Sequence, residues 1–222
     1  MLTLGIETAS DTCSVALHDG AEALAEAALY VPRSHGRRLA PLIYQVFEHV
    51  DRAPQDLDLV AVSAGPGSYT GLRIGVSTAK GLALSTGAAL VAVPTLDALA
   101  EAAGSHTVPL VTVLPSRRGE VYAAAYAASG EPLRPPTALS LTEAGPWVPE
   151  GEVAVAGPGM RLLTEAVADR TWSRLRVELS GRAVGRLGAR RFAEHGPDDP
   201  STVEPMYLKP VATSQPRAIF GV

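Results

Sequence analysis

The stretch of residues 63–73 reads SAGPGSYTGLR and decides the fold, because a strand, a turn and a helix meet within it. The run LDLVAVS at residues 57–63 leads into it and predicts a strand that is apolar enough to be central and parallel in a sheet. After the glycines, a helix is expected to continue to about Thr86. Strands that alternate with helices in this way predict an α/β fold.

The turn between that strand and that helix is a candidate anion site. Glycines permit positive φ and a close approach of the backbone, and free N–H groups at the start of a helix attract negative charge. Gly65, Gly67 and Ser68 are therefore candidates for a phosphate-binding loop. The stretch lacks the Gly-x-x-x-x-Gly-Lys-Ser/Thr motif of a P-loop, and Pro66 stands where a nucleophile elbow has glycine. A tight turn that binds no ligand is the alternative.

Working outward, the first half of the chain predicts a meander of strands, then a helix, then parallel strands with helices between them. The clearest helix covers residues 38–52, where apolar side chains recur at helical spacing. A turn at Asp19-Gly20 separates two of the strands. The remaining expected elements are strands at residues 2–7, 13–18, 23–31 and 90–93 and a helix at residues 95–103.

The second half restarts the same pattern. Two similar α/β lobes are therefore expected, residues 1–104 and residues 105–222, joined near Gly104-Ser105. The proline-rich stretches 131–136 and 145–149 predict loops. The expected elements of this half are strands at residues 108–114, 120–128 and 152–156, a helix from Met160 and an amphipathic helix at residues 182–195.

Small residues recur along the helix that follows the glycine turn. Gly71, Gly75 and Ala79 stand four residues apart, so they form a stripe against which another helix can pack closely. The stripe belongs either to a subunit interface or to packing against this chain's own sheet or its helix at residues 38–52, and the sequence favours neither.

Composition and charge exclude several classes of protein. The chain has 222 residues, of which 46% are hydrophobic, and a formal net charge of -4, which is inconsistent with disorder. With 19 basic against 23 acidic residues it lacks the basic excess typical of a protein that grips nucleic acid alone. One cysteine excludes a disulfide scaffold. No secretory signal and no membrane span are recognised, so a cytoplasmic protein is expected.

Few side chains are candidates for a catalytic or metal-binding role. Glu7 ends the first strand, where two-lobed phosphotransferases commonly place an acid that holds a metal–nucleotide; here the sequence Glu7-Thr8-Ala9 replaces their Asp-x-Gly, and a solvated acid is expected. No two of the five histidines have zinc-motif spacing. Cys13 is expected to be a small buried thiol. We therefore expect no catalytic residue, no metal site and no cofactor.

Five segments resemble the family of bacterial TsaB (YeaZ) proteins. They are IETAS at residues 6–10, SAGPGSYTGLRIG at 63–75, AKGLA at 79–83, VPTLDALA at 93–100 and GEVYAA at 119–124. The block at residues 63–83 is specific to TsaB and its catalytic paralogue TsaD. Two places depart from the family pattern: Pro115-Ser116-Arg117 replaces the usual Asp-Ala-Arg, and Lys209 replaces the arginine of a Tyr-x-Arg motif.

The resemblance implies the actin-like/sugar-kinase/Hsp70 (ASKHA) fold, two lobes with a cleft. It also implies a non-catalytic subunit of the complex that forms threonylcarbamoyladenosine in tRNA next to the anticodon, because the His-x-x-x-His metal motif of TsaD has no counterpart at residues 95–100. The implied partners are TsaD in a heterodimer, the ATPase TsaE, a second copy when the chain is alone, and tRNA only through the complex. The implied partner interface lies on the helices at residues 38–52 and 71–86, at Leu39, Leu42, Ile43, Gly71, Ile74, Gly75, Thr78, Ala79 and Leu82.

Two enzymatic hypotheses compete with this one. A nucleotide-binding phosphotransferase of the same fold would use the glycine turn at residues 65–71. A peptidase acting on a partner finds little support, because the sequence has no zinc pair, nucleophile elbow or acid dyad.

Overall fold

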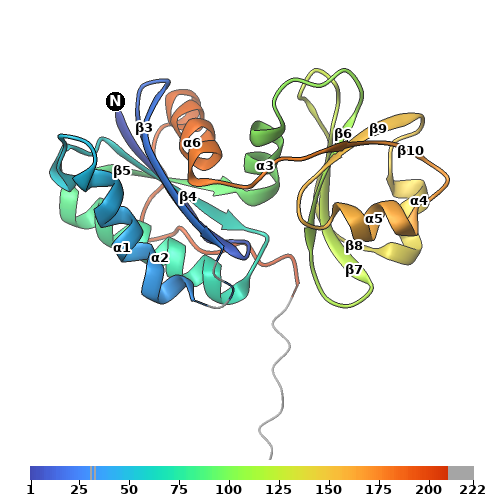
Figure 1. The fold of residues 1–222 in the computed structure, drawn as a ribbon, viewed down its shortest axis with the longest axis horizontal. Coiled ribbons are helices and arrows are strands. Elements are labelled where there is room, and N and C mark those ends of the chain that lie inside the picture. Colours follow the sequence, from blue (N-terminus) through green and yellow to red (C-terminus); the bar gives the residue numbers. More distant parts are fainter. Residues whose placement is uncertain (31, 33, 210–222) are drawn as a thin grey trace, which may run out of the picture.

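The computed structural model describes residues 1–30, 32 and 34–209, folded around two five-stranded mixed sheets (Figure 1). The strand orders are β3-β2-β1-β4-β5 and β10-β9-β6-β7-β8. None of the helices in the described ranges is long and apolar enough to cross a membrane. The strands are β1 (Leu2–Glu7), β2 (Thr12–Asp19), β3 (Glu22–Tyr30), β4 (Leu59–Gly65), β5 (Ala89–Pro94), β6 (Leu110–Pro115), β7 (Glu120–Tyr126), β8 (Pro132–Ser140), β9 (Glu152–Ala156) and β10 (Thr171–Leu175). The α-helices are α1 (His35–Glu48), α2 (Tyr69–Thr86), α3 (Thr95–Ala103), α4 (Ala144–Trp147), α5 (Met160–Ala166) and α6 (Gly181–His195).

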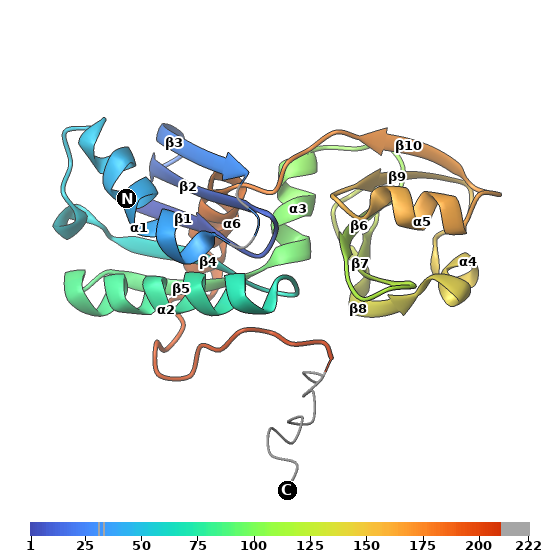
Figure 2. The same cartoon turned by 60° about the horizontal axis from the view of Figure 1, so that its bottom comes forward.

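Helices cover both faces of the first sheet (Figure 2). Its central strand β1 pairs antiparallel with β2 and parallel with β4. Because side chains alternate between the faces of a strand, Leu4 and Ile6 join the core under α1 and α2, whereas Gly5 faces α6. This sandwich buries β1 completely and holds its carboxyl end in place.

Helix α6 lies unusually close to the first sheet because glycines meet at the crossing. A Cβ atom at Gly181 would stand 2.7 Å from both the carbonyl oxygen of Gly5 and the Cα of Val15. The amide of Gly181 also donates a hydrogen bond to the Ser14 hydroxyl, with the two atoms 3.0 Å apart. No larger side chain fits at this contact, so the crossing depends on glycine.

The second sheet repeats the arrangement of the first. Strand β6 pairs antiparallel with β7 and parallel with β9. One face packs on α4 and α5, with Leu163 fully buried there. The other face joins Leu96 and Leu99 of α3 and residues of α6 in a core shared by the two lobes. The expected α/β architecture of two lobes is confirmed.

The structure differs from the expected local structure in four places. Residues 131–136 are not a loop, since Pro132–Ser140 form β8, an edge strand on which proline can be tolerated. Residues 145–149 include the short helix α4 instead of a loop only. Strand β10 was not expected at all. The helix expected at residues 38–52 begins earlier, at His35, and ends at Glu48. Residue 31 of the third expected strand lies outside the described residues.

The division of the chain at residues 104/105 stays a prediction, and residues 210–222 of its second lobe lie outside the described part. The packing cuts across this division. Helix α6 belongs to the second half of the chain, yet it contacts β1, β2, β4 and β5 of the first sheet. The physical reason is the glycine crossing described above, which joins segments distant in sequence.

Residues 197–209, which we call the C-terminal strap, return along the first lobe toward the second (Figure 2). Near its start, Asp198 donates its amide to the Leu90 carbonyl at 2.8 Å and accepts the Ala92 amide at 2.7 Å, which covers the edge strand β5. Further on, Met206 donates to the Ala64 carbonyl. At its end, Lys209 forms an ion pair with Glu120 at the start of β7. The strap thus connects the two lobes.

Candidate functional site

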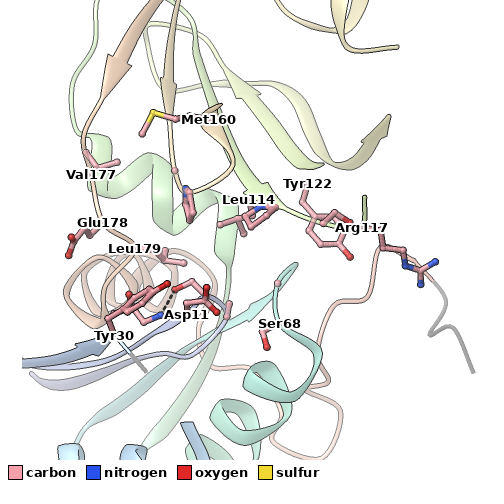
Figure 3. A pocket seen from close by; sticks show the side chains of 18 residues that line it. Asp11, Tyr30, Ser68, Leu114, Arg117, Tyr122, Met160, Val177, Glu178 and Leu179 are labelled. Atoms are coloured by element: carbon pink, nitrogen blue, oxygen red, sulfur yellow. Dashed lines mark hydrogen bonds between the residues drawn. The ribbon is translucent and has the colours of Figure 1, made fainter. Parts of the chain in front are cut away.

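A cavity of about 620 Å³ lies between the lobes and is the candidate site (Figure 3). The first lobe lines it with the turn at residues 9–12 and with residues 67–68 before α2. The second lobe lines it with the corresponding turn at 115–117 and with residues 157–158, and residues 177–179 close it where the chain crosses back. Both sheets therefore present the end of a central strand to one cavity.

The turn residues proposed for phosphate binding are only partly at this cavity. Gly67 and Ser68 line it, but Gly65 is buried, and a Cβ there would stand 2.5 Å from the carbonyl oxygen of Met206 in the strap. The Ser68 amide donates to the Ala9 carbonyl at 2.7 Å, and the Ser68 hydroxyl accepts the Gly71 amide at 3.2 Å. Two donors of this turn are thus already used within the protein, and phosphate binding stays a prediction.

Glu7 is not the solvated acid that the sequence suggested, because its side chain is fully buried. Its Oε1 accepts the amides of Ala9 and Ser10, at 2.6 and 3.1 Å, and so holds the turn that lines the cavity. Its Oε2 has no hydrogen-bond partner among the described residues. Burial raises the pKa of Glu7 to about 7, although the neighbouring Ser63 hydroxyl and the amides of Ala9 and Ser10 oppose the shift.

Cys13 is a buried thiol, as expected. Burial, with the nearby charge of Glu7, raises its pKa to about 11. A thiol that stays protonated at neutral pH is a poor nucleophile. Cys13 therefore belongs to the core under α1 and α2.

No group of three or more His, Cys, Asp or Glu side chains in residues 1–30, 32 and 34–209 is placed to hold a metal ion. His18 is buried on β2, its ring lies against Gly185 of α6, and its pKa is lowered, first by burial and then by Arg182 and Arg186. His106 lies near the joint between the lobes, with its ring nitrogens 3.0 and 3.1 Å from the carbonyl oxygens of Gly104 and Ala127. These histidines serve packing and local hydrogen bonding.

The small-residue stripe on α2 faces the protein's own sheet. The Thr8 hydroxyl donates to the Gly71 carbonyl at 2.8 Å, and a Cβ at Gly75 would collide with that same hydroxyl. Ala79 is fully buried. The stripe therefore packs inside the first lobe, which is the alternative that the sequence left open.

This packing corrects the expected interface. Six of its residues, Leu39, Leu42, Ile43, Gly71, Gly75 and Ala79, are buried within the first lobe and have too little free surface to contact a partner. Ile74, Thr78 and Leu82 remain partly exposed on α2, so their contact with a partner stays a prediction. Two large side chains elsewhere on these helices are exposed, Tyr44 on α1 and Leu84 on α2.

Sequence reasoning missed one wall of the cavity. Val177, Glu178 and Leu179 line it between β10 and α6, and Tyr30 at the end of β3 lines it from the first lobe. Figure 3 shows Asp11 and Tyr30 on one side of the cavity and Tyr122 and Arg117 on the other. No local pattern marks these residues, because the return of α6 to the first sheet is what brings residues 177–179 to the cavity.

The sequence of this chain is similar to those of known proteins. The family model TsaD, described as tRNA N6-adenosine threonylcarbamoyltransferase, matches residues 29–156, more than half of the chain. The chain is similar to the tRNA threonylcarbamoyladenosine biosynthesis protein TsaB of Bacillus subtilis (strain 168), with 40% identity over 127 residues, 57% of this chain and 55% of the relative. It is similar to the protein of the same name of Escherichia coli (strain K12), with 35% identity over 128 residues, 57% of this chain and 55% of the relative.

In these matches the chain spans about half the length of the curated relatives. The solved structure of YeaZ from Pseudomonas aeruginosa superposes over nearly the whole chain, with a TM-score of 0.79, 23% identity, and coverage of 93% of this chain and 99% of that one. The shared fold extends through both lobes. The chain therefore belongs to the TsaD family and, within it, to the TsaB (YeaZ) group.

Proposed function

We propose that the chain is a non-catalytic subunit of the cytoplasmic complex that forms threonylcarbamoyladenosine in tRNA next to the anticodon. It binds the catalytic paralogue TsaD in a heterodimer, helps to recruit the ATPase TsaE, and contacts tRNA within that complex. When alone it forms a homodimer. The names of the relatives support the pathway, and the burial of Glu7 supports the non-catalytic role.

The observation that carries this proposal is the position of Glu7. A carboxylate that holds a metal–nucleotide must reach the cavity, whereas Glu7 is fully buried and its Oε1 is used by two amides of its own turn. Because burial also favours the neutral acid near pH 7, Glu7 is a poor ligand for a cation. Glu7 is thus not placed to hold a metal–nucleotide in the cavity.

The exposed surface of α1 and α2 is the surface that we assign to the partner. Leu84 is 75% exposed and Tyr44 is 68% exposed, and the partly exposed Ile74 and Leu82 lie on the same helix pair. Large apolar side chains at the surface favour protein contacts, in which aromatic anchors often dominate the binding energy. The same face would serve a homodimer when TsaD is absent.

The test is sedimentation velocity of the chain mixed with TsaD. Leu84→Glu places a charge in the proposed interface and should weaken the association about tenfold or more, since one unpaired buried charge costs well above 1.4 kcal/mol. Leu162→Glu, at an exposed leucine of α5 in the second lobe, is the matched control and should leave the affinity unchanged. Equal affinities for the wild type and both variants would reject this surface.

A phosphotransferase is the second candidate, because two corresponding turns and Gly157 line the cavity between the lobes. Titration calorimetry with ATP and Mg²⁺ separates the two functions. Micromolar binding together with turnover by the isolated chain would favour the phosphotransferase. Our proposal predicts no turnover.

A further inference from the structure

Three side chains from distant parts of the sequence form a cluster on the surface at the start of α2. The Arg73 guanidinium lies over the Tyr69 ring, with its Cζ 4.1 Å from the ring centroid. Its Nε donates a hydrogen bond to the Tyr207 hydroxyl at 3.0 Å. The rings of Tyr69 and Tyr207 are themselves in contact, with centroids 5.1 Å apart. The C-terminal strap thus contributes Tyr207 to the cluster, and α2 contributes the other two residues.

The cluster holds Arg73 in place without neutralising it. Arg73 is exposed, and no ion pair joins it to any carboxylate of residues 1–30, 32 and 34–209. Ring stacking and the Nε hydrogen bond leave the two terminal nitrogens free to donate. Fixing a long side chain costs up to about 2 kcal/mol of rotamer entropy. A guanidinium that is already fixed binds an anion with less of this loss.

A second cation lies along the same groove. The groove has a volume of about 250 Å³ and lies between α2 and the strap, lined by Arg73, Ser77, Lys80 and Tyr207 among others. Lys80 is seven residues after Arg73, which is about 10 Å along the helix axis. Ser77 stands between the two residues in the sequence, and its side chain is exposed. Glu204 of the strap lines the groove too, and Asp199 lies close enough to Lys80 to interact with it electrostatically.

We propose that this groove binds the phosphodiester backbone of an RNA strand, with Arg73 and Lys80 each contacting a phosphate. The terminal nitrogens of a fixed guanidinium match two phosphate oxygens, and a lysine at this spacing reaches another phosphate along the strand. Tyr69 and Tyr207, with 37% and 39% of their surfaces exposed, offer ring surface beside the cations on which a base can stack. A protein partner that supplied only carboxylates would bring no base to stack on these rings.

The proposal rests on the proposed function, because it names where this subunit touches tRNA. The chain's net charge of -4 opposes RNA binding at long range, and Glu204 opposes it locally. Binding by the chain alone is therefore expected to be weak and to fall steeply with salt. Within the complex, a partner that holds the same RNA raises its local concentration at the groove.

Fluorescence anisotropy with a labelled anticodon stem-loop RNA at low salt tests the proposal on the full chain. Arg73→Gln and Lys80→Gln should each weaken binding about five- to tenfold and lower the slope of log affinity against log salt by about 0.7 to 0.9, the value of one lost phosphate contact. Arg161→Gln, at an exposed arginine of α5 that forms an ion pair with Glu165, should leave both quantities unchanged. Equal affinities in all four proteins would overturn the proposal.

A variant that should tighten RNA binding distinguishes a lost contact from a loss of structure. Glu204→Gln removes the acid of the groove and should tighten RNA binding about twofold or more, which no loss of structure would do. Weaker or unchanged binding by this variant contradicts a phosphate in the groove. Competition by poly-glutamate as effective as that by poly-uridine would also overturn the proposal, in favour of an acidic protein partner. Sedimentation of Arg73→Gln with TsaD reports separately on the proposed function.

Discussion

At the scale of single residues, Glu7 is held where water does not reach it. Its carboxyl group closes the turn at residues 9–12 through Oε1, while Oε2 lacks a partner among the described residues. A buried acid with one unpartnered oxygen is more stable neutral than charged. This environment explains why its pKa is raised to about 7.

The raised pKa predicts how stability depends on pH. The folded state keeps the proton of Glu7 up to about pH 7, whereas the unfolded chain releases it near 4.5, the ordinary pKa of a glutamate side chain. Between these values the folded state binds more protons, so this group's contribution to the free energy of unfolding falls as pH rises from about 4.5 to 7. The full difference is on the order of 3 kcal/mol.

Glu7→Gln should remove this contribution, since glutamine keeps an acceptor for the two amides and has no proton to lose. Urea unfolding at several pH values measures the effect. The variant should be more stable than the wild type at pH 8, with the advantage shrinking toward pH 4.5. If the free energy of unfolding depended on pH in the same way in both proteins, burial of Glu7 would not destabilise the fold as pH rises, and the prediction would be wrong.

At the scale of elements, the contact between α6 and the first sheet shows what a local pattern cannot predict. The hydrophobic spacing of α6 predicts a helix correctly, but its place on the first sheet follows from glycines at residues 5 and 181 that come together only in the fold. Strand β8 was missed because prolines mask an edge strand. Strand β10, only partly buried, shows no clear alternation of apolar and polar residues.

Two glycine-to-alanine substitutions in helices should therefore have opposite effects. At Gly181 the added methyl group would meet backbone atoms of Gly5, Val15 and Ala16 that cannot give way, and should destabilise the fold by about 1–3 kcal/mol. At Gly81 on α2 nothing lies within 4 Å, and alanine should stabilise by about 0.5–1 kcal/mol. Thermal unfolding compares the two. A stabilising Gly181→Ala would contradict the close crossing.

At the scale of the whole molecule, two sheets of equivalent topology enclose one cavity, and the strap connects them from outside. The alternation of strands and helices in the sequence predicts the two lobes, and the segment at residues 63–73 predicts the turn at the cavity. The sequence does not predict which helix residues face outward, because a stripe of small residues fits a sheet as well as it fits a partner. Nor does it bring Tyr207 to Arg73, which is 134 residues away along the chain.

The most direct test of a non-catalytic role is reconstituted synthesis. Threonylcarbamoyladenosine formed on tRNA from an activated threonylcarbamoyl donor and ATP is measured with TsaD and TsaE, with or without this chain, and with Glu7→Gln in its place. We predict that product forms efficiently only when the chain is present, and that Glu7→Gln supports the same rate as the wild type. Product formation without the chain, or a large loss of rate with a folded Glu7→Gln that still binds TsaD, would contradict the role proposed here.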